Sequence, residues 1–412
     1  FKVIDYLIIG GGIAGTAAAE AIRSKDSEGS VAVVSAEPHF LYSRVLLPEF
    51  VKGEVGLDKV MLRSEADYRE KGIKIILGEK VAVLDLTARR AELASGEKLE
   101  FKKLLIASGG GPEPWIFEKE APESIFRLQT LDDAKRMLAF FEERKSGEAL
   151  VVGGGFIALE LAEILAKRNF RTEIICREKS LWGGYLDDEC LGFLKGVWAG
   201  HGITFVSEDE ADSVKRENGR ALIKTQKGRT FEADFVGVGI GIRRNLDFFP
   251  HLVVGPLSGG AEVNEYLETG FPDVWAAGDA AYYPDLMTGK KRLCRTWSEA
   301  FMQGRVAGLN MARLRRQAGG KEVFKMIPAY SIGHFGQTIT FVGDIFTSGG
   351  AFDSRGSVLT KLAGKKEGEY VRISEEGGVI RGAVMINAQN MVGSVFKAIL
   401  NEETVEEYLR KS

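Results

Sequence analysis

The sequence predicts an α/β protein in which one domain is inserted into another and a small α+β domain follows them. A glycine-rich turn between an apolar, strand-like run and an apolar, helix-like run occurs twice, at Gly10 and at Gly153. Further apolar runs that end in glycine turns follow each copy. From about Met326 the pattern changes to short alternating strands with glycine turns, which indicates a separate unit.

The first glycine turn has the spacing of a dinucleotide-binding motif. Residues 3–9 predict a buried strand and residues 13–23 a helix, with Gly10, Gly12 and Gly15 spaced as G-x-G-x-x-G between them. The first glycine allows a tight turn, the second lets a pyrophosphate approach the backbone, and the third lets the helix pack on the strand. The phosphates then lie at the positive end of the helix.

The second turn repeats this pattern with one change. An apolar run from Ala149 leads into Gly153 and Gly155, and the third small residue is Ala158. One such motif is weak evidence, because glycine-rich turns are common. Two copies, each between a strand and a helix, predict two Rossmann-like domains and two dinucleotide sites.

The residues that meet the adenosine ribose differ between the two domains. Glu37 follows the second strand of the first domain, where an acid bonds ribose hydroxyls, although a solvated loop glutamate is the alternative. The matching residue of the second domain is Cys176, followed by Arg177 and Glu178. An acid favours NADH and an arginine accepts the 2′-phosphate of NADPH, so both nucleotides stay open, with Glu178 favouring NADH.

The other elements follow from apolar periodicity and glycine turns. Arg44, in the loop after Glu37, is either a surface charge or a phosphate clamp. The remaining predicted elements are strands within 73–84 with a turn at Gly78, a strand at 104–109, a helix at 131–144, strands at 172–176, 235–242 and 273–279, a helix at 298–317 that ends in a basic run, and a closing helix at 402–410.

Composition excludes several classes of function. The net charge of −3 does not suggest a nucleic-acid surface, and no uncharged apolar run reaches the ~18 residues of a membrane span. The chain begins on a predicted strand, so we expect no cleaved signal and a cytoplasmic protein. The four histidines show no metal spacing. Cys176, Cys190 and Cys294 form no C-x-x-C pair and are expected to be buried small side chains.

Taken together, the motifs resemble the FAD-dependent pyridine nucleotide-disulfide oxidoreductase superfamily over nearly all 412 residues. The resemblance implies FAD at the first turn and NADH or NADPH at the second. The five motifs, in the family's order, are Gly10-x-Gly12-x-x-Gly15, Ala107-Ser108-Gly109, Gly153-x-Gly155-x-x-Ala158, Gly237-Val-Gly239-Ile-Gly241 and Ala276-Ala-Gly278-Asp279. The implied FAD residues are Gly10, Gly12, Ala14, Gly15, Glu37, Arg44, Val81, Ala107, Ser108, Gly109, Gly278 and Asp279. The implied nicotinamide-nucleotide residues are Gly153, Gly155, Phe156, Ile157, Ala158, Arg177, Glu178, Gly239 and Gly241.

Within the superfamily the chain is most similar to the class that lacks the redox disulfide. The stretches at Tyr42–Leu47 and Trp297–Gly304 resemble NAD(P)H-dependent ferredoxin and rubredoxin reductases and the flavin module of assimilatory nitrite reductase. The resemblance implies catalytic roles for Glu160, at the nicotinamide and flavin edge, and for Trp297, against the flavin. The alternatives are an acid that complements a helix dipole and an ordinary core aromatic.

Three departures from the family pattern stand out. The Cys-x4-Cys of the disulfide reductases and the single active cysteine of the coenzyme A disulfide reductases are both missing near residues 40–50. Ferredoxin reductases pair a lysine in this region with the glutamate that matches Glu160, and the matching stretch here is Leu47-Pro48-Glu49. Arg244 replaces a proline that is usual after the turn at Gly241.

These inferences define the predicted organisation. Residues 1–113 and 246–325 form the FAD-binding domain, 114–245 the NAD(P)-binding domain and 326–412 the C-terminal domain. The predicted activity passes hydride from a nicotinamide to the flavin and electrons on to a ferredoxin, a rubredoxin or a reductase partner. An oxidase that uses O2 and a flavoprotein with mainly a binding or sensing role are the alternatives, and either a monomer or a homodimer is compatible with the sequence.

Overall fold

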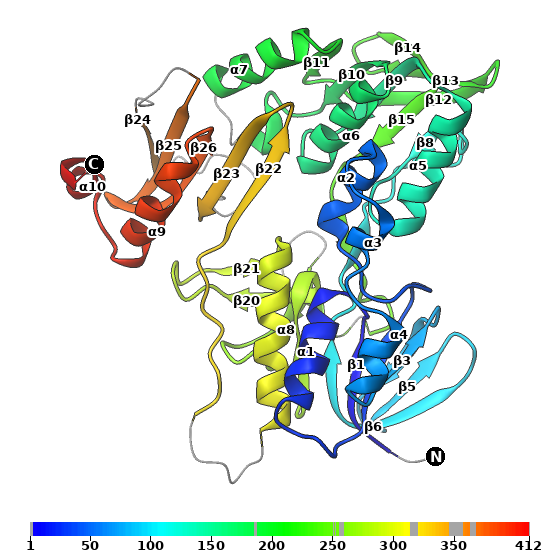
Figure 1. Cartoon of the computed structure of the whole chain (residues 1–412), viewed down its shortest axis with the longest axis vertical. Helices are drawn as coiled ribbons and strands as arrows, with labels where there is room; N and C mark the ends of the chain where they lie inside the picture. Colours follow the sequence, from blue (N-terminus) through cyan, green and yellow to red (C-terminus); the bar gives the residue numbers. More distant parts are fainter. Residues whose placement is uncertain are drawn as a thin grey trace. The chain divides into compact units, whose positions relative to one another are not determined.

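The computed structural model describes residues 3–184, 188–249, 251, 253–254, 259–313, 320–345, 357–362 and 368–411. It forms two compact units (Figure 1). Unit 1 comprises Phe1–Val45, Leu57–Gly111 and Ile242–Met326, and unit 2 comprises Leu46–Gly56, Pro112–Gly241 and Ile327–Ser412. The C-terminal residues therefore group with the inserted segment, and their assignment to a third domain stays a prediction.

Unit 1 is built on a seven-stranded sheet. Its parallel part has the strand order β3-β2-β1-β6-β19. The N-terminal half of β6 also pairs with β5, and β5 pairs with β4; both of these pairings are antiparallel. The strands β1 and β2 are almost fully buried, as expected for parallel strands covered on both faces. The strands are β1 (Ile4–Ile9), β2 (Val31–Ser35), β3 (Ile73–Leu77), β4 (Val81–Asp85), β5 (Arg90–Leu93), β6 (Lys98–Ile106) and β19 (Val274–Ala276).

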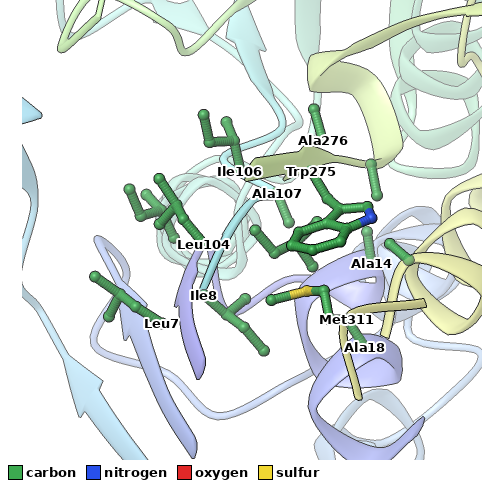
Figure 2. Packing of buried hydrophobic residues seen from close by; sticks show 14 of the residues in the cluster. Leu7, Ile8, Ala14, Ala18, Leu104, Ile106, Ala107, Trp275, Ala276 and Met311 are labelled. Atoms are coloured by element: carbon green, nitrogen blue, oxygen red, sulfur yellow. The ribbon is translucent and has the colours of Figure 1, made fainter. Parts of the chain in front are cut away.

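Two helices of unit 1 pack closely on each other. These are α1 (Ile13–Arg23) and α8 (Trp297–Ala312). A Cβ atom on Gly304 would lie 2.0 Å from the backbone oxygen of Ala14, and one on Gly308 would lie 2.4 Å from that of Ala18. Because only glycine fits at these two positions, they set the distance between the helices. Figure 2 shows the neighbouring core, where helix residues such as Met311 join the strand residue Trp275.

The rest of unit 1 consists of short elements. A four-stranded sheet has the order β17-β18-β20-β21, and β7 pairs with β16 where the chain passes between units. These elements are α3 (Leu57–Val60), α4 (Glu65–Glu70), β7 (Gly110–Pro112), β16 (Ile242–Arg244), β17 (Val253–Val254), β18 (Gly260–Glu262), β20 (Ala281–Pro284) and β21 (Lys291–Leu293).

Unit 2 contains a second parallel sheet, of order β11-β10-β9-β15-β8, together with a three-stranded antiparallel sheet, β12-β13-β14. The strands are β8 (Ile125–Phe126), β9 (Gly147–Val152), β10 (Phe170–Cys176), β11 (Ile203–Ser207), β12 (Ala211–Glu217), β13 (Arg220–Thr225), β14 (Thr230–Ala233) and β15 (Phe235–Val238). The helices are α2 (Leu47–Lys52), α5 (Leu131–Glu143), α6 (Phe156–Lys167) and α7 (Asp188–Ala199).

The C-terminal part of unit 2 is an antiparallel sheet of order β22-β23-β26-β25-β24 that packs against α9. Its elements are β22 (Ala329–His334), β23 (Gln337–Gly343), β24 (Ser357–Leu362), β25 (Tyr370–Glu376), β26 (Val379–Ile386), α9 (Val392–Leu400) and α10 (Val405–Lys411).

The structure confirms the predicted α/β class, the helix at 13–23 and the strand-turn-strand at 73–84. The predicted helix at 298–317 was too long, because it ends at Ala312 and Arg313 already has extended backbone. Residues 314–317 of the predicted helix, which include the rest of the basic run, lie outside the described residues. The helix α9 was not predicted; it is a nine-residue, mainly apolar run with a glycine near its start, and Val395, Ala398 and Ile399 form its buried face.

The close approach of α8 to α1 can be tested at Gly308. We expect Gly308→Ala to lower the free energy of unfolding by about 1–3 kcal/mol, because the added methyl group meets the backbone of Ala18 and the helices must move apart. Gly196→Ala is the matched control in the interior of α7. Nothing lies within 4 Å of that position, so alanine should stabilise the helix by about 0.5–1 kcal/mol. Calorimetric unfolding of both variants measures the difference, and equal changes would contradict the packing argument.

Candidate functional site

The first glycine turn in unit 1 is shaped by close backbone contacts. Gly10 has a φ of 118°, and a Cβ atom there would lie 2.0 Å from the backbone oxygen of Ala107. A Cβ atom on Gly15 would lie 1.9 Å from the backbone oxygen of Gly10. Gly12 begins α1 without a side-chain cap, and nothing lies within 4 Å of its Cβ position. The first N–H groups of α1 therefore face an open space that suits a phosphate.

Two further predicted motifs lie next to this turn. The strand β19 pairs with β6, and a Cβ atom on Gly278 would lie 3.1 Å from Cβ of Ala14. The Gly278 N–H donates to Oε1 of Gln303 at 2.8 Å. Nε2 of Gln303 and Oγ of Ser108 are buried and have no hydrogen-bond partner among the described residues. Buried polar atoms are normally paired, so these two fit a site that accepts a polar cofactor such as FAD.

Charged residues surround Asp279 in the same unit. Burial raises the pKa of Asp279 above its ordinary value, and the positive charges of Arg244 and Arg44 oppose this rise. Arg244, which stands where the family has a proline, donates from Nε to the backbone oxygen of Asp279 at 3.2 Å. Glu37 accepts from the Tyr42 hydroxyl and from Arg44, both at 2.5 Å. Glu37, Arg44 and Asp279 therefore belong to one group of neighbouring charges.

Gly109, another predicted FAD residue, has a φ of 66°, and its backbone oxygen accepts from the Asn245 N–H at 3.0 Å. The last two predicted residues of unit 1, Trp297 and Val81, have different surroundings. Trp297 is half-buried and begins α8, directly after the N-cap Thr296. Val81 is 2% exposed and lies in the hydrophobic core, opposite Leu93 in the pairing of β4 with β5. Neither position tests the roles that the resemblance implies for these two residues, which stay predictions.

The second glycine turn, in unit 2, repeats the backbone contacts of the first. Gly153 has a φ of 126°, and a Cβ atom there would lie 2.2 Å from the backbone oxygen of Gly239. Gly155 begins α6, again with nothing within 4 Å of its Cβ position. Ala158 lies in α6 with its N atom 3.1 Å from the Cβ position of Gly239, and Gly241 has a φ of 115°. The Gly153 and Gly239 motifs are thus brought together.

Aliphatic, aromatic and charged side chains surround the second glycine turn. Ile157 contacts the Cβ position of Gly239 at 3.3 Å. The ring of Phe156 packs against Trp182 and Tyr330, with both centroid distances 5.1 Å. Arg177 and Glu178 form an ion pair of 3.0 Å just beyond the end of β10. All the predicted nucleotide residues of unit 2 therefore lie at the turn, at the ends of neighbouring strands or beside them.

Glu160 lies in the second turn of α6, in a group of charged side chains. Burial and then the charge of Glu49 raise the pKa of Glu160 to about 8, and Lys52 opposes this rise. The first turn of α6 contains no acidic residue, so the alternative that Glu160 complements the helix dipole is wrong. The stretch Leu47-Pro48-Glu49 lacks the family lysine, but Lys52, at the end of α2, supplies a positive charge to this group.

Lys52 belongs to a buried network that the sequence did not reveal. Its side chain is 7% exposed, and Nζ lies 3.5 Å from Oε1 of Glu49 and 3.6 Å from Oε2 of Glu163. Nδ1 of His334 lies 3.8 Å from the same Glu163 oxygen, and the Trp198 indole donates to Nε2 of His334 at 2.7 Å. Burial lowers the pKa of His334 to about 4, so it is neutral at pH 7.

The described residues contain no group of three metal-ligating side chains. All three cysteines are buried, and none of them forms a disulfide. In the same part of the chain, no helix is long and apolar enough to cross a membrane.

Two glycine turns of the same geometry, each between a strand and a helix, define a protein with two dinucleotide-binding units. Residues 4–304 match the pyridine nucleotide-disulphide oxidoreductase family, and the chain belongs to this family. It is an oxidoreductase that uses FAD and NAD(P)H.

Two relatives show the range of the family. The seedling isozyme of monodehydroascorbate reductase from Cucumis sativus is 32% identical over 301 residues, which are 69% of each protein. Subunit epsilon of the NADH-dependent phenylglyoxylate dehydrogenase of Aromatoleum evansii is 29% identical over 385 residues, which are 93% of this chain and 88% of the relative.

Solved structures share the fold. Putidaredoxin reductase, from its covalent complex with putidaredoxin, has a TM-score of 0.85 and 18% identity, with 97% of this chain and 93% of that chain covered. The NADH:rubredoxin oxidoreductase of Clostridium acetobutylicum has a TM-score of 0.76 and 24% identity, with 100% of both chains covered. At these identities the likeness establishes the architecture alone.

The surroundings of Asp279 lead to a prediction about FAD. We expect Asp279→Asn to weaken FAD binding by about 10- to 100-fold, because a hydrogen bond to a charged group is worth about 1.5–3 kcal/mol. Fluorescence titration of the apoprotein with FAD measures the change. Asp273→Asn, a half-buried acid just before the same strand, is the control and should bind FAD as the wild type does. Equal affinities of all three proteins would exclude a role for Asp279 in FAD binding.

The raised pKa of Glu160 predicts a pH dependence of stability. Between pH 4.5 and about 8 the folded protein holds a proton on Glu160 that the unfolded chain releases, so stability falls as the pH rises through this window. Glu160→Gln removes this contribution and should flatten the profile. At pH 9 the variant should be more stable than the wild type by on the order of a few kcal/mol.

Urea unfolding of the wild type and Glu160→Gln between pH 5 and 9 tests this expectation. Glu143→Gln, at the exposed end of α5, is the control and should keep the wild-type profile. Parallel profiles for wild type and Glu160→Gln would show that Glu160 is already ionised at neutral pH.

Proposed function

We propose that unit 1 binds FAD at the Gly10 turn, that unit 2 binds NADH at the Gly153 turn, and that the protein passes electrons from NADH through the flavin to a small redox protein. One observation carries the proposal. The same open helix N-terminus, with the same glycine–carbonyl contact beside it, is found in both units. When bound, the flavin accepts a hydride and releases electrons one or two at a time.

The chain's own residues have defined tasks in this proposal. The N–H groups at the starts of α1 and α6 bind the pyrophosphates of the two cofactors. Asp279 and Glu37 accept hydrogen bonds from FAD hydroxyl groups. Glu160 is protonated at neutral pH and donates a hydrogen bond to an acceptor atom of the nicotinamide. An ionised carboxylate could not donate this bond.

The state of the cysteines supports a redox protein, rather than a disulfide, as electron acceptor. Burial raises the pKa of Cys176 to about 12 and that of Cys294 well above its ordinary value. Thiol–disulfide chemistry needs an accessible thiolate, which neither residue provides. Putidaredoxin reductase and NADH:rubredoxin oxidoreductase, whose architecture the chain shares, are by their names reductases of small electron carriers.

Anaerobic titration of the FAD-loaded protein tests the first half of the proposal. One equivalent of NADH should bleach the flavin absorbance, and Gly155→Val should abolish this bleaching. Nothing lies within 4 Å of the Cβ position of Gly155, so we expect the valine side chain to extend into the open space at the start of α6 that the pyrophosphate needs. The variant should still bind FAD and be reduced by dithionite, which separates loss of the nucleotide site from misfolding.

The second half requires a panel of acceptors. Ferredoxin, rubredoxin, O2 and an artificial quinone are offered to the NADH-reduced protein, and we expect the one-electron carrier proteins to be reduced at least about tenfold faster than O2. Faster oxidation by O2 would identify an oxidase. A protein that is bleached by NADH but reduces none of these acceptors would point to a binding or sensing role.

A further inference from the structure

The thiol of Cys176 packs against the second glycine turn. Cys176 is the last residue of β10 and is 1% exposed. A Cβ atom on Gly154 would lie 2.5 Å from its Sγ, so the sulfur packs directly against the turn. The Gly153 N–H donates to the backbone oxygen of Ile175 at 2.9 Å, which holds the end of β10 beside the turn. The side chain therefore has little freedom to move.

The thiol is a hydrogen-bond donor to the glutamate two residues further on. Sγ of Cys176 lies 3.2 Å from Oε2 of Glu178 and 3.9 Å from the backbone oxygen of Ser180. Burial and the hydrogen bond to Glu178 raise the pKa of Cys176 to about 12. The sulfur consequently keeps its proton at all physiological pH values and continues to donate.

The other oxygen of Glu178 is held from the opposite side. Oε1 accepts from Nε of Arg177 at 3.3 Å and from its terminal nitrogen at 3.0 Å. Burial alone would raise the pKa of Glu178, but the hydrogen bonds from Cys176 and Arg177 outweigh it and keep the pKa below its ordinary value. A carboxylate has about four lone-pair positions, so the fixed Glu178 can still accept bonds from a ligand.

We propose that Cys176 positions Glu178 and thereby makes the second nucleotide site selective for NADH over NADPH. The inference rests on the proposed function and deepens it. In most Rossmann folds the acid that bonds the ribose hydroxyls stands at the end of the second strand, which is the place of Cys176. Here the thiol occupies that place and fixes the acid two residues later. The fixed carboxylate bonds the ribose hydroxyls of NADH and repels the 2′-phosphate of NADPH.

The arrangement also accounts for Arg177. A free arginine at this position would favour the 2′-phosphate. Its guanidinium is instead engaged by Glu178, so the positive charge that could attract NADPH is balanced as long as the carboxylate stays in place. Loss of the thiol donor would release the carboxylate and, with it, the arginine. The selectivity, expressed as the ratio of two dissociation constants, should therefore depend on a side chain that bears no charge.

The test uses calorimetric titration of the FAD-loaded protein with NAD⁺ and with NADP⁺. Cys176→Ala should weaken NAD⁺ binding by about 5- to 10-fold, the equivalent of about one lost hydrogen bond, and leave NADP⁺ binding equal or tighter. Cys176→Ser should restore the wild-type preference to within about twofold, because its hydroxyl also donates to the carboxylate. A residue that merely supported the fold would change both affinities together and would not be rescued in this way.

Two controls complete the design. Cys190→Ala removes another fully buried thiol of unit 2, in α7, and should leave the ratio unchanged. Glu178→Gln should lose as much preference as Cys176→Ala, and the double variant should lose no more than either, because both act through one carboxylate. Independent, additive losses in this cycle would overturn the proposal.

The outcomes also separate this inference from the function on which it rests. If the wild type binds NAD⁺ and Cys176→Ala leaves the ratio of the NAD⁺ and NADP⁺ dissociation constants unchanged, only the proposed role of Cys176 is excluded. A wild-type preference for NADP⁺ also overturns it. A correctly folded, FAD-loaded protein that binds neither nucleotide removes the proposed function and this inference together.

Discussion

The contact between a glycine and the carbonyl group of a neighbouring strand is the constraint on which both units depend. In unit 1 it joins Gly10 to Ala107, and in unit 2 it joins Gly153 to Gly239. Each contact brings the turn after the first strand against the end of an adjacent strand, and in doing so it fixes the direction in which the next helix begins. Any side chain at the glycine would separate the two strand ends. The site therefore follows from backbone packing and is completed by only a few side chains.

Both turns have a partly or fully buried carboxyl group nearby, but the two are balanced differently. Asp279 faces the guanidinium groups of Arg244 and Arg44, whose charge is fixed at any physiological pH. Glu160 lies near the buried amine of Lys52, which also contacts Glu49 and Glu163, and Glu163 has a second ion pair with Lys167. Burial and the negative charges of Glu49 and Glu163 outweigh the charge of Lys52 at Glu160, so the protonated form of Glu160 is favoured. Asp279 in unit 1 thus lies beside two arginines, whereas Glu160 in unit 2 is largely protonated at neutral pH.

Local signals in the sequence account for what could be predicted. The turns at Gly10 and Gly153 depend on residues within about fifteen positions of one another, and apolar periodicity defines the strands and helices beside them. The network of Lys52, Glu163 and His334 could not be found in this way, because its members come from three distant segments that only the tertiary fold brings together. The hydrogen bond from Cys176 to Glu178 could be predicted only in part. The sequence identifies both residues as neighbours of the ribose site, but the direction of the thiol depends on its packing against Gly154.

The glycines of α8 have a consequence for the order in which the chain acquires its structure. The partner that covers α1 is encoded after the whole stretch from Ser24 to Thr296. At about 5–20 residues per second, a ribosome needs on the order of 15–55 s to reach it. During that time the small-residue face of α1 is uncovered, while the segment Pro112–Gly241 is already complete. The Pro112–Gly241 part of unit 2 can therefore fold before α8 is made, whereas unit 1 is completed only when α8 arrives and unit 2 gains its segment Ile327–Ser412 later still.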